Sequence, residues 1–125
     1  MDVKIRRTID FVPKWRDNDK DDNPIVFLLK YLTSSEYDDC FGISPAEFDD
    51  QGKKITGGEV TIDRKKMFLA AVTEILNFNT VDERNEKMAI KTGQDMLDCP
   101  GTEDLFFEII TFIRSTDVEE TDSKN

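Results

Sequence analysis

The order of two hydrophobic periodicities along the chain most constrains its fold. Residues Val3–Phe11 alternate between apolar and polar side chains, which predicts a half-buried strand, although Arg7 interrupts the apolar face. Residues Ile25–Leu32 are apolar on both faces, which predicts a more central strand. The acidic stretch between them, Pro13–Pro24, is short enough for the two strands to form an antiparallel hairpin.

The second half of the chain carries the helical pattern. Asp63 is placed to cap a helix over residues Arg64–Phe78, and Thr102 is placed to cap the last helix. Apolar residues at helical spacing predict one buried stripe on each of these helices. The two stripes consist of Met67, Phe68, Ala71, Val72, Ile75 and Leu76, and of Leu105, Phe106, Ile109, Ile110 and Ile113.

Two shorter segments precede the first of these helices. Thr33 or Ser34 can cap a short helix that ends at Gly42, followed by an irregular or briefly helical segment to about Gln51. Lys54–Thr56 and Glu59–Ile62 flank Gly57-Gly58, which predicts a small second hairpin.

A polar connection separates the two helical stripes. Residues Asn79–Lys91 form this connection, with room for a helical turn or two. Thr92 opens a capping box for a short helix through Asp98, and Pro100-Gly101 ends it.

These elements together predict one α+β domain over residues 1–116. A small antiparallel sheet, built from the N-terminal hairpin and the short second hairpin, packs against three to four helices in the C-terminal half. Residues 117–125 are too polar to pack and are predicted to form an acidic flexible tail.

Charge and cysteine usage narrow the function classes. The 125 residues include 17 basic and 27 acidic side chains, for a net charge of −10, and this charge repels phosphate backbones and anionic lipids. We therefore expect neither a nucleic-acid nor a membrane partner. No signal-like segment and no apolar run of spanning length is present, so we expect a cytoplasmic protein in which Cys40 and Cys99 stay unpaired.

The residues also argue against catalysis and against a bound metal or cofactor. The chain has no histidine, which removes the usual base for a cysteine nucleophile, and two isolated cysteines do not make a zinc site. Asp17, Asp19 and Asp21 resemble the start of a calcium loop. However, Asp22 stands where the loop needs glycine and Leu28 stands where it needs a bidentate glutamate. We expect a protein that binds another macromolecule and is not an enzyme.

Four aromatic residues are the candidate protein contacts. Phe78, Phe107 and Phe112 lie off the apolar stripes, so they are the residues to inspect for exposure. Trp15 lies in a polar loop, where an aromatic ring needs either a covering surface or a partner.

Two stretches of the sequence resemble a known family. The segment IDFVPKWRDNDKDDNPIVFLLKYLT and the segment IKTGQDMLDCPGTEDLFFEIITFIRST resemble small tail assembly chaperones of long-tailed bacteriophages and prophages. Further shared features are a helix ending near Ile75-Leu76-Asn77, a polar linker, a short capped helix, a Pro-Gly break, a longer helix and an acidic tail. The resemblance implies a non-catalytic protein that binds the tape-measure protein during tail morphogenesis, in the cytoplasm of a bacterial host. The tail-tube protein is a second partner that it implies.

Two alternatives stay open at this point. An acidic inhibitor that mimics DNA would block a host DNA-binding protein, and it would need carboxylates arrayed on one face at phosphate-like spacing. A structural tail or capsid component would form a homo-oligomer through an edge strand such as Val3–Phe11.

Overall fold

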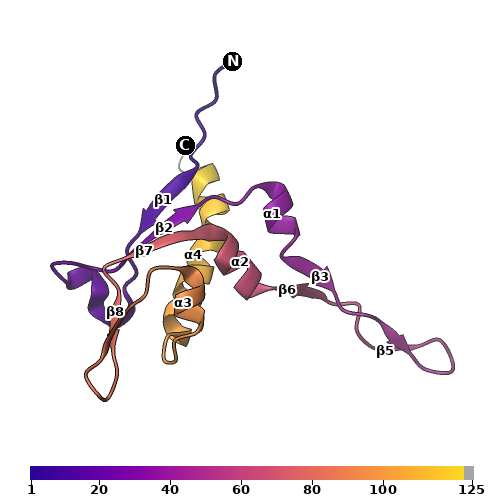
Figure 1. Ribbon diagram of the computed structural model, residues 1–125. Helices are drawn as coiled ribbons and strands as arrows, with labels where there is room; N and C mark the ends of the chain where they lie inside the picture. The colour runs from indigo at the N-terminus through magenta and orange to yellow at the C-terminus, as the bar shows by residue number, and fades with distance from the viewer. Residues whose placement is uncertain (123–125) are drawn as a thin grey trace.

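A three-stranded antiparallel sheet forms the centre of the protein (Figure 1). The computed structural model describes the backbone of residues 1–122 and the side chains through Ser115. The sheet has the order β1-β2-β7, with β1 at Thr8–Phe11, β2 at Val26–Lys30 and β7 at Val72–Leu76. The predicted N-terminal hairpin and the central place of the second strand are thus confirmed, together with a fold of mixed α and β elements.

Four α-helices and one 3₁₀ helix accompany this sheet within residues 1–122. They are η1 (Trp15–Lys20), α1 (Ser34–Asp38), α2 (Arg64–Ala71), α3 (Gly93–Leu97) and α4 (Glu103–Asp122). Phe27 of β2, Phe68 of α2 and Ile109 of α4 belong to one buried cluster, so sheet and helices share a core. Both predicted stripes supply this core, except that Leu76 is exposed.

Local capping signals start three of the helices where the sequence predicts, although α1 ends at Asp38 and Gly42, its predicted end, lies in β3. The Asp63 side chain accepts a hydrogen bond from the backbone N–H of Lys66 at the start of α2. Thr92 and Asp95 form a reciprocal capping box at α3, and Thr33 and Glu36 form one at α1. Such caps satisfy backbone N–H groups that a helix leaves without partners in its first turn.

The helix predicted over Arg64–Phe78 is wrong beyond Ala71. The chain instead enters β7, which pairs with β2 through the register Phe27↔Ile75. Val72, Thr73 and Ile75 are β-branched and favour a strand. This pairing also satisfies the backbone groups on the second edge of β2, which a helix at residues 72–76 would leave unpaired.

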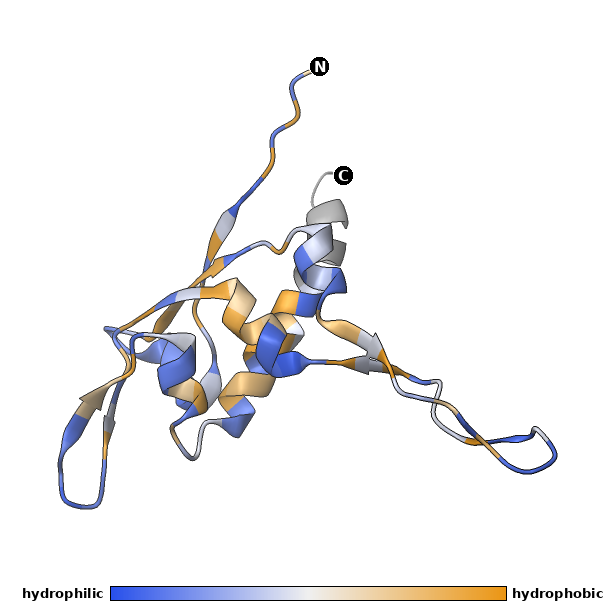
Figure 2. Cartoon of the chain, turned by 45° about the vertical axis from the view of Figure 1, so that its right-hand side comes forward, coloured by the Kyte–Doolittle hydropathy of each residue, from blue (hydrophilic) through white to orange (hydrophobic). Residues whose placement is uncertain are grey.

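The predicted second hairpin is also wrong in its pairing. Four strands are present: β3 (Phe41–Ile43), β4 (Glu47–Phe48), β5 (Lys54–Thr56) and β6 (Val60–Ile62). β3 pairs with β6 and β4 pairs with β5, and the segment to Gln51 is therefore not irregular or helical. Residues 41–62 form one long arm that projects from the body (Figures 1 and 2). The chain reverses at its hydrophilic tip, where the Asp49 side chain accepts from the backbone N–H groups of Gln51 and Lys53.

Gly57 continues one side of this arm instead of turning it. Its φ angle is +87°, which L side chains rarely adopt. A Cβ atom at Gly57 would lie 1.7 Å from the backbone oxygen of Pro45. Glycine is therefore required here by a close approach of two backbone segments.

Three further segments differ from the predictions. Residues 79–91 contain a hairpin of β8 (Asn79–Val81) and β9 (Lys87–Ala89) in place of a plain connection. The N-terminal strand begins only at Thr8, because β2 has ended at Lys30 and offers no partner further along. α4 extends to Asp122, into the segment predicted as a tail, and residues 123–125 lie outside the described part of the chain.

Candidate functional site

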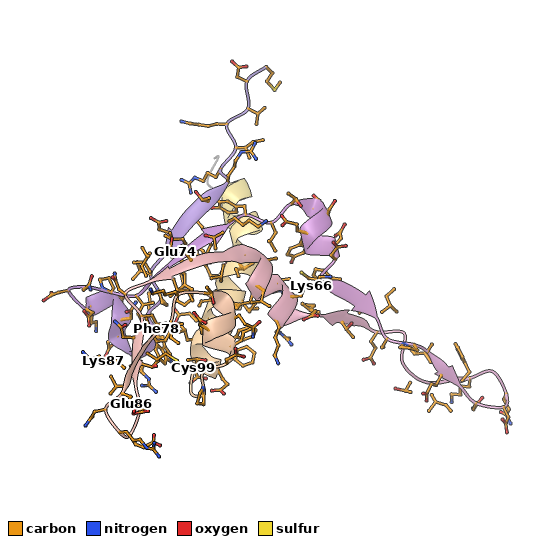
Figure 3. All side chains as sticks on the ribbon, in the orientation of Figure 1. Lys66, Glu74, Phe78, Glu86, Lys87 and Cys99 are labelled. Carbon is orange, nitrogen blue, oxygen red and sulfur yellow. The ribbon has the colours of Figure 1, made fainter. Side chains whose placement is uncertain are left out.

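A groove lies between η1, the β8–β9 hairpin and the turn from α3 to α4. Its volume is about 640 Å³, and we call it the Trp15 groove. Its lining includes Trp15, Phe78, Val81, Met88, Cys99 and Pro100. Figure 3 shows Phe78 and Cys99 on the body of the protein and Glu86 and Lys87 further out along the hairpin. The groove therefore combines aromatic, sulfur-containing and aliphatic side chains from three separate elements.

The loop that carries Trp15 is held in place by one buried asparagine. The Asn18 Nδ2 donates to the backbone oxygens of Pro13 and Ile25, at 2.9 and 3.0 Å. Its Oδ1 accepts from the backbone N–H of Ile25, at 2.7 Å. Arg16 and Asp17 adopt left-handed φ angles of 51° and 58° within this loop. Asn18 thus fixes a locally unfavourable backbone that positions the tryptophan.

Trp15 packs against two neighbours. Its ring centroid lies 6.0 Å from that of Phe78, at a tilted angle, and the Arg16 guanidinium lies 4.6 Å from the Trp15 ring centroid. Phe78 is only 5% exposed and belongs to the core. The structure therefore brings these two predicted residues together, with Phe78 as a support and half-buried Trp15 as the side chain available at the surface.

Phe107 lies in a second depression, formed by α1, α2 and α4. This Phe107 depression has a volume of about 460 Å³ and is lined by Tyr37, Arg64, Phe107, Ile110, Thr111, Arg114 and Ser115. Phe107 is 54% exposed, although its ring makes an edge contact with Phe106 at 5.8 Å. Two arginines beside an exposed aromatic ring make this a locally basic and apolar spot on an acidic chain.

Phe112 is not an exposed contact. Its ring stacks on Phe11 with centroids 4.1 Å apart and an interplanar angle of 21°. In the same region, the Lys14 backbone N–H donates to the Glu108 carboxylate at 2.6 Å. Phe112 therefore joins α4 to β1 instead of presenting a surface.

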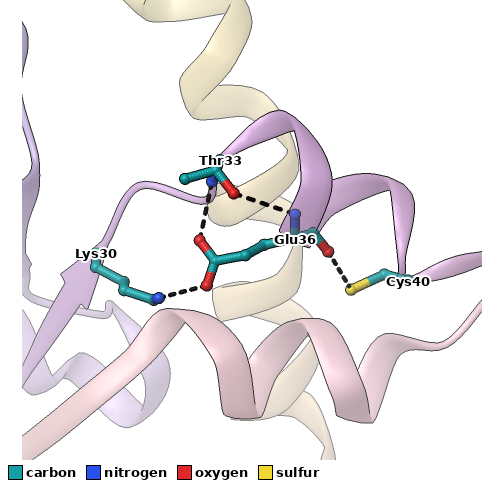
Figure 4. A network of polar contacts seen from close by, with 4 residues as sticks. All are labelled: Lys30, Thr33, Glu36 and Cys40. Carbon is teal, nitrogen blue, oxygen red and sulfur yellow. Dashed lines mark hydrogen bonds and ion pairs between the residues drawn. The ribbon is translucent and has the colours of Figure 1, made fainter.

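A polar network positions α1, which contributes Tyr37 to the Phe107 depression (Figure 4). Lys30 donates to the Glu36 side chain, which also accepts from the Thr33 backbone N–H at 3.0 Å. The hydrogen bond from Lys30, followed by that from Thr33, lowers the pKa of Glu36 below its usual value of 4.5. The Cys40 thiol donates to the Glu36 backbone oxygen at 3.3 Å, and burial raises the pKa of this thiol.

Sequence reasoning missed the exposed apolar residues of the arm. Ile43, Phe48, Ile55 and Val60 are all largely exposed. Short β-branched and aromatic stretches on both sides of Gly57-Gly58 are the signal that could have revealed them. The sequence predicts an irregular segment to about Gln51 and a small hairpin after it, whereas the arm pairs the two segments and carries these side chains away from the core.

Comparison with protein family models, curated proteins and solved structures finds no match to this chain. Cys40 and Cys99 are both unpaired. Among the described residues, no cluster of three or more histidine, cysteine or acidic side chains has an arrangement that could hold a metal ion. No helix in the part of the chain that the structure describes combines the length and the apolar character needed to cross a bilayer.

Proposed function

We propose that the protein is a bacteriophage tail assembly chaperone that binds the tape-measure protein without catalysis, and that the Phe107 depression receives the client. The observation that carries the proposal is a large aromatic side chain, 54% exposed, in a depression that three helices form. The resemblance of the sequence to small tail assembly chaperones supplies the identity of the client.

The chemistry of the depression suits a helical client. Phe107 and half-buried Tyr37 offer an apolar surface on which one face of an amphipathic helix can lie, whereas Ile110 is only 3% exposed and belongs to the core. Arg64 and Arg114 line the same depression and can donate paired hydrogen bonds to carboxylates of the client. A tape-measure protein has long helical stretches that aggregate when they are exposed. The net charge of −10 on the chaperone would oppose aggregation of the complex.

The test is a pull-down of the tagged protein from phage-producing cells, with mass spectrometry of the recovered proteins. We expect the wild-type protein to recover the tape-measure protein and Phe107→Ser to lose it. Val81→Ser is the matched control, because Val81 is 55% exposed but lies on the β8–β9 hairpin. Chemical unfolding of all three proteins establishes that the variants remain folded.

Three outcomes would contradict the proposal. Absence of the tape-measure protein from the wild-type sample would reject the function, and equal recovery by Phe107→Ser would reject the site. Recovery of a host DNA-binding protein that competing DNA releases would favour the DNA mimic instead.

A further inference from the structure

Residues 2–7 have the pattern of a strand but no partner strand within residues 1–122. Val3 and Ile5 alternate with polar residues, and Ile5 is 70% exposed. The backbone oxygen of Arg7 accepts from the N–H of Tyr31 at 2.9 Å. Beyond this bond, the segment that follows β2 turns into α1 and no longer runs beside the N-terminal residues. Figure 1 shows the N-terminal segment leaving the body alone. Apart from the Arg7 oxygen, the backbone groups of this segment are therefore available to another strand.

The base of the arm presents the complementary feature, an unpaired sheet edge with an apolar surface. Ser44 N–H donates to the Glu59 oxygen at 2.9 Å, and Asp63 N–H donates to the Cys40 oxygen at 2.7 Å. In an antiparallel ribbon these bonds join alternate residue pairs, so the backbone groups of Ile43 in β3 point outward. Ile43 is 75% exposed and pairs with the exposed Val60 on β6. A third strand would extend this two-stranded ribbon, which is marginally stable alone.

Charge indicates which strand fits this edge. Residues 1–7 contain three basic side chains, Lys4, Arg6 and Arg7, against one acid, whereas the arm contains four acids and two lysines. Pairing two N-terminal segments would place basic side chains opposite each other, which destabilises a sheet. β3 and β6 themselves carry no charged side chain, and Glu59 and Asp63 flank β6, so an N-terminal segment paired with this ribbon meets no basic side chain in either strand.

The two segments leave the body in different directions in both views (Figures 1 and 2), so their pairing requires two copies of the chain. We propose that residues 2–7 of one copy add as a third strand to the β3–β6 ribbon of a second copy. This heterologous contact joins copies head to tail, and it produces a reciprocal dimer, a ring or a filament according to the rotation between neighbours. The inference does not depend on the identity of the client.

Sedimentation velocity over a range of protein concentrations at low salt tests this inference. We expect the wild type to self-associate, and Ile5→Asp and Ile43→Asp each to weaken association by about tenfold or more, because each buries a charge at the new contact. Val81→Asp, at a site that is 55% exposed on the β8–β9 hairpin, should associate as the wild type does. Because Ile5 and Ile43 are exposed in the single chain, the unfolding curves of both variants should match that of the wild type.

Mixing the two variants gives the decisive measurement. Ile5→Asp retains an intact arm and Ile43→Asp retains an intact N-terminal segment, so the mixture should regain a dimer that neither variant forms alone. A monomeric wild type at every concentration would overturn the inference. Association lost only in Ile5→Asp would indicate pairing between N-terminal segments, and association lost only in Ile43→Asp would indicate pairing between arms; either result would overturn it too.

Discussion

Replacing Asn18 with alanine should loosen the loop that carries Trp15. The substitution removes three hydrogen bonds, two donated by Nδ2 and one accepted by Oδ1. Each intramolecular hydrogen bond contributes about 1 kcal/mol net, and a buried group left unpaired costs about 1–3 kcal/mol. Pro13 is buried, whereas Ile25 is partly accessible, so water can replace some of the lost partners. We expect the free energy of unfolding to fall by about 2–3 kcal/mol.

Trp15 is the single tryptophan of the chain and reports on this loop directly. Chemical denaturation followed by circular dichroism gives the change in stability, with a lowered midpoint and an unchanged slope. Tryptophan emission of the native state gives the local effect. In Asn18→Ala the emission should shift to longer wavelength and acrylamide should quench it more strongly, because the ring loses its fixed place against Phe78.

Asn23→Ala is the matched control, since Asn23 is exposed in the same loop and should change stability by less than about 0.5 kcal/mol. Asn18→Asp provides a second comparison. It keeps the acceptor for the Ile25 N–H but loses both donors, and should also be destabilised. The reasoning would be refuted if Asn18→Ala unfolded within about 0.5 kcal/mol of the wild type with unchanged emission.

Three further predictions concern other parts of the structure. Gly57→Ala should raise the rate of amide hydrogen exchange throughout the arm with little change in the core, because the new Cβ would lie 1.7 Å from the backbone oxygen of Pro45. Gly52→Ala is the control, and it should perturb the arm less because there is open space around Gly52. The free energy of unfolding should fall as the pH drops through and below 4.5. The lowered pKa of Glu36 means that its hydrogen bonds stabilise the folded state only while the carboxylate is ionised. Glu36→Gln should therefore lose less stability than the wild type in denaturation series from about pH 7 to about pH 3. A thiol reagent at neutral pH should label half-buried Cys99 faster than buried Cys40, and equal rates by mass spectrometry would contradict the burial of Cys40.

The candidate site was predictable in part. Trp15 was identified because an aromatic ring in a polar loop needs a covering surface, and the structure provides one in Phe78. Phe107 was identified because it lies off the apolar stripe of its helix, and it is exposed. The same argument failed for Phe78 and Phe112, because elements distant in sequence cover both rings.

The amino-acid sequence by itself determined the features that depend on neighbouring residues. The caps at Thr33, Asp63 and Thr92 follow from side chains that bond to the backbone within three positions. The N-terminal hairpin follows from two apolar patterns close enough to pair. Each of these features is satisfied within one stretch of chain, so a local pattern is sufficient to predict it.

Only the tertiary structure decided which strands pair. Residues 72–76 fit both a helical stripe and a strand, and the free edge of β2 selected the strand. The arm formed in the same way, because β3 and β6 bond across the intervening residues and leave Gly57 between β5 and β6 on one side of the arm. A strand satisfies its backbone through a partner that can lie anywhere in the chain, whereas a helix satisfies its backbone within itself, and short apolar segments therefore take the state that the rest of the fold completes.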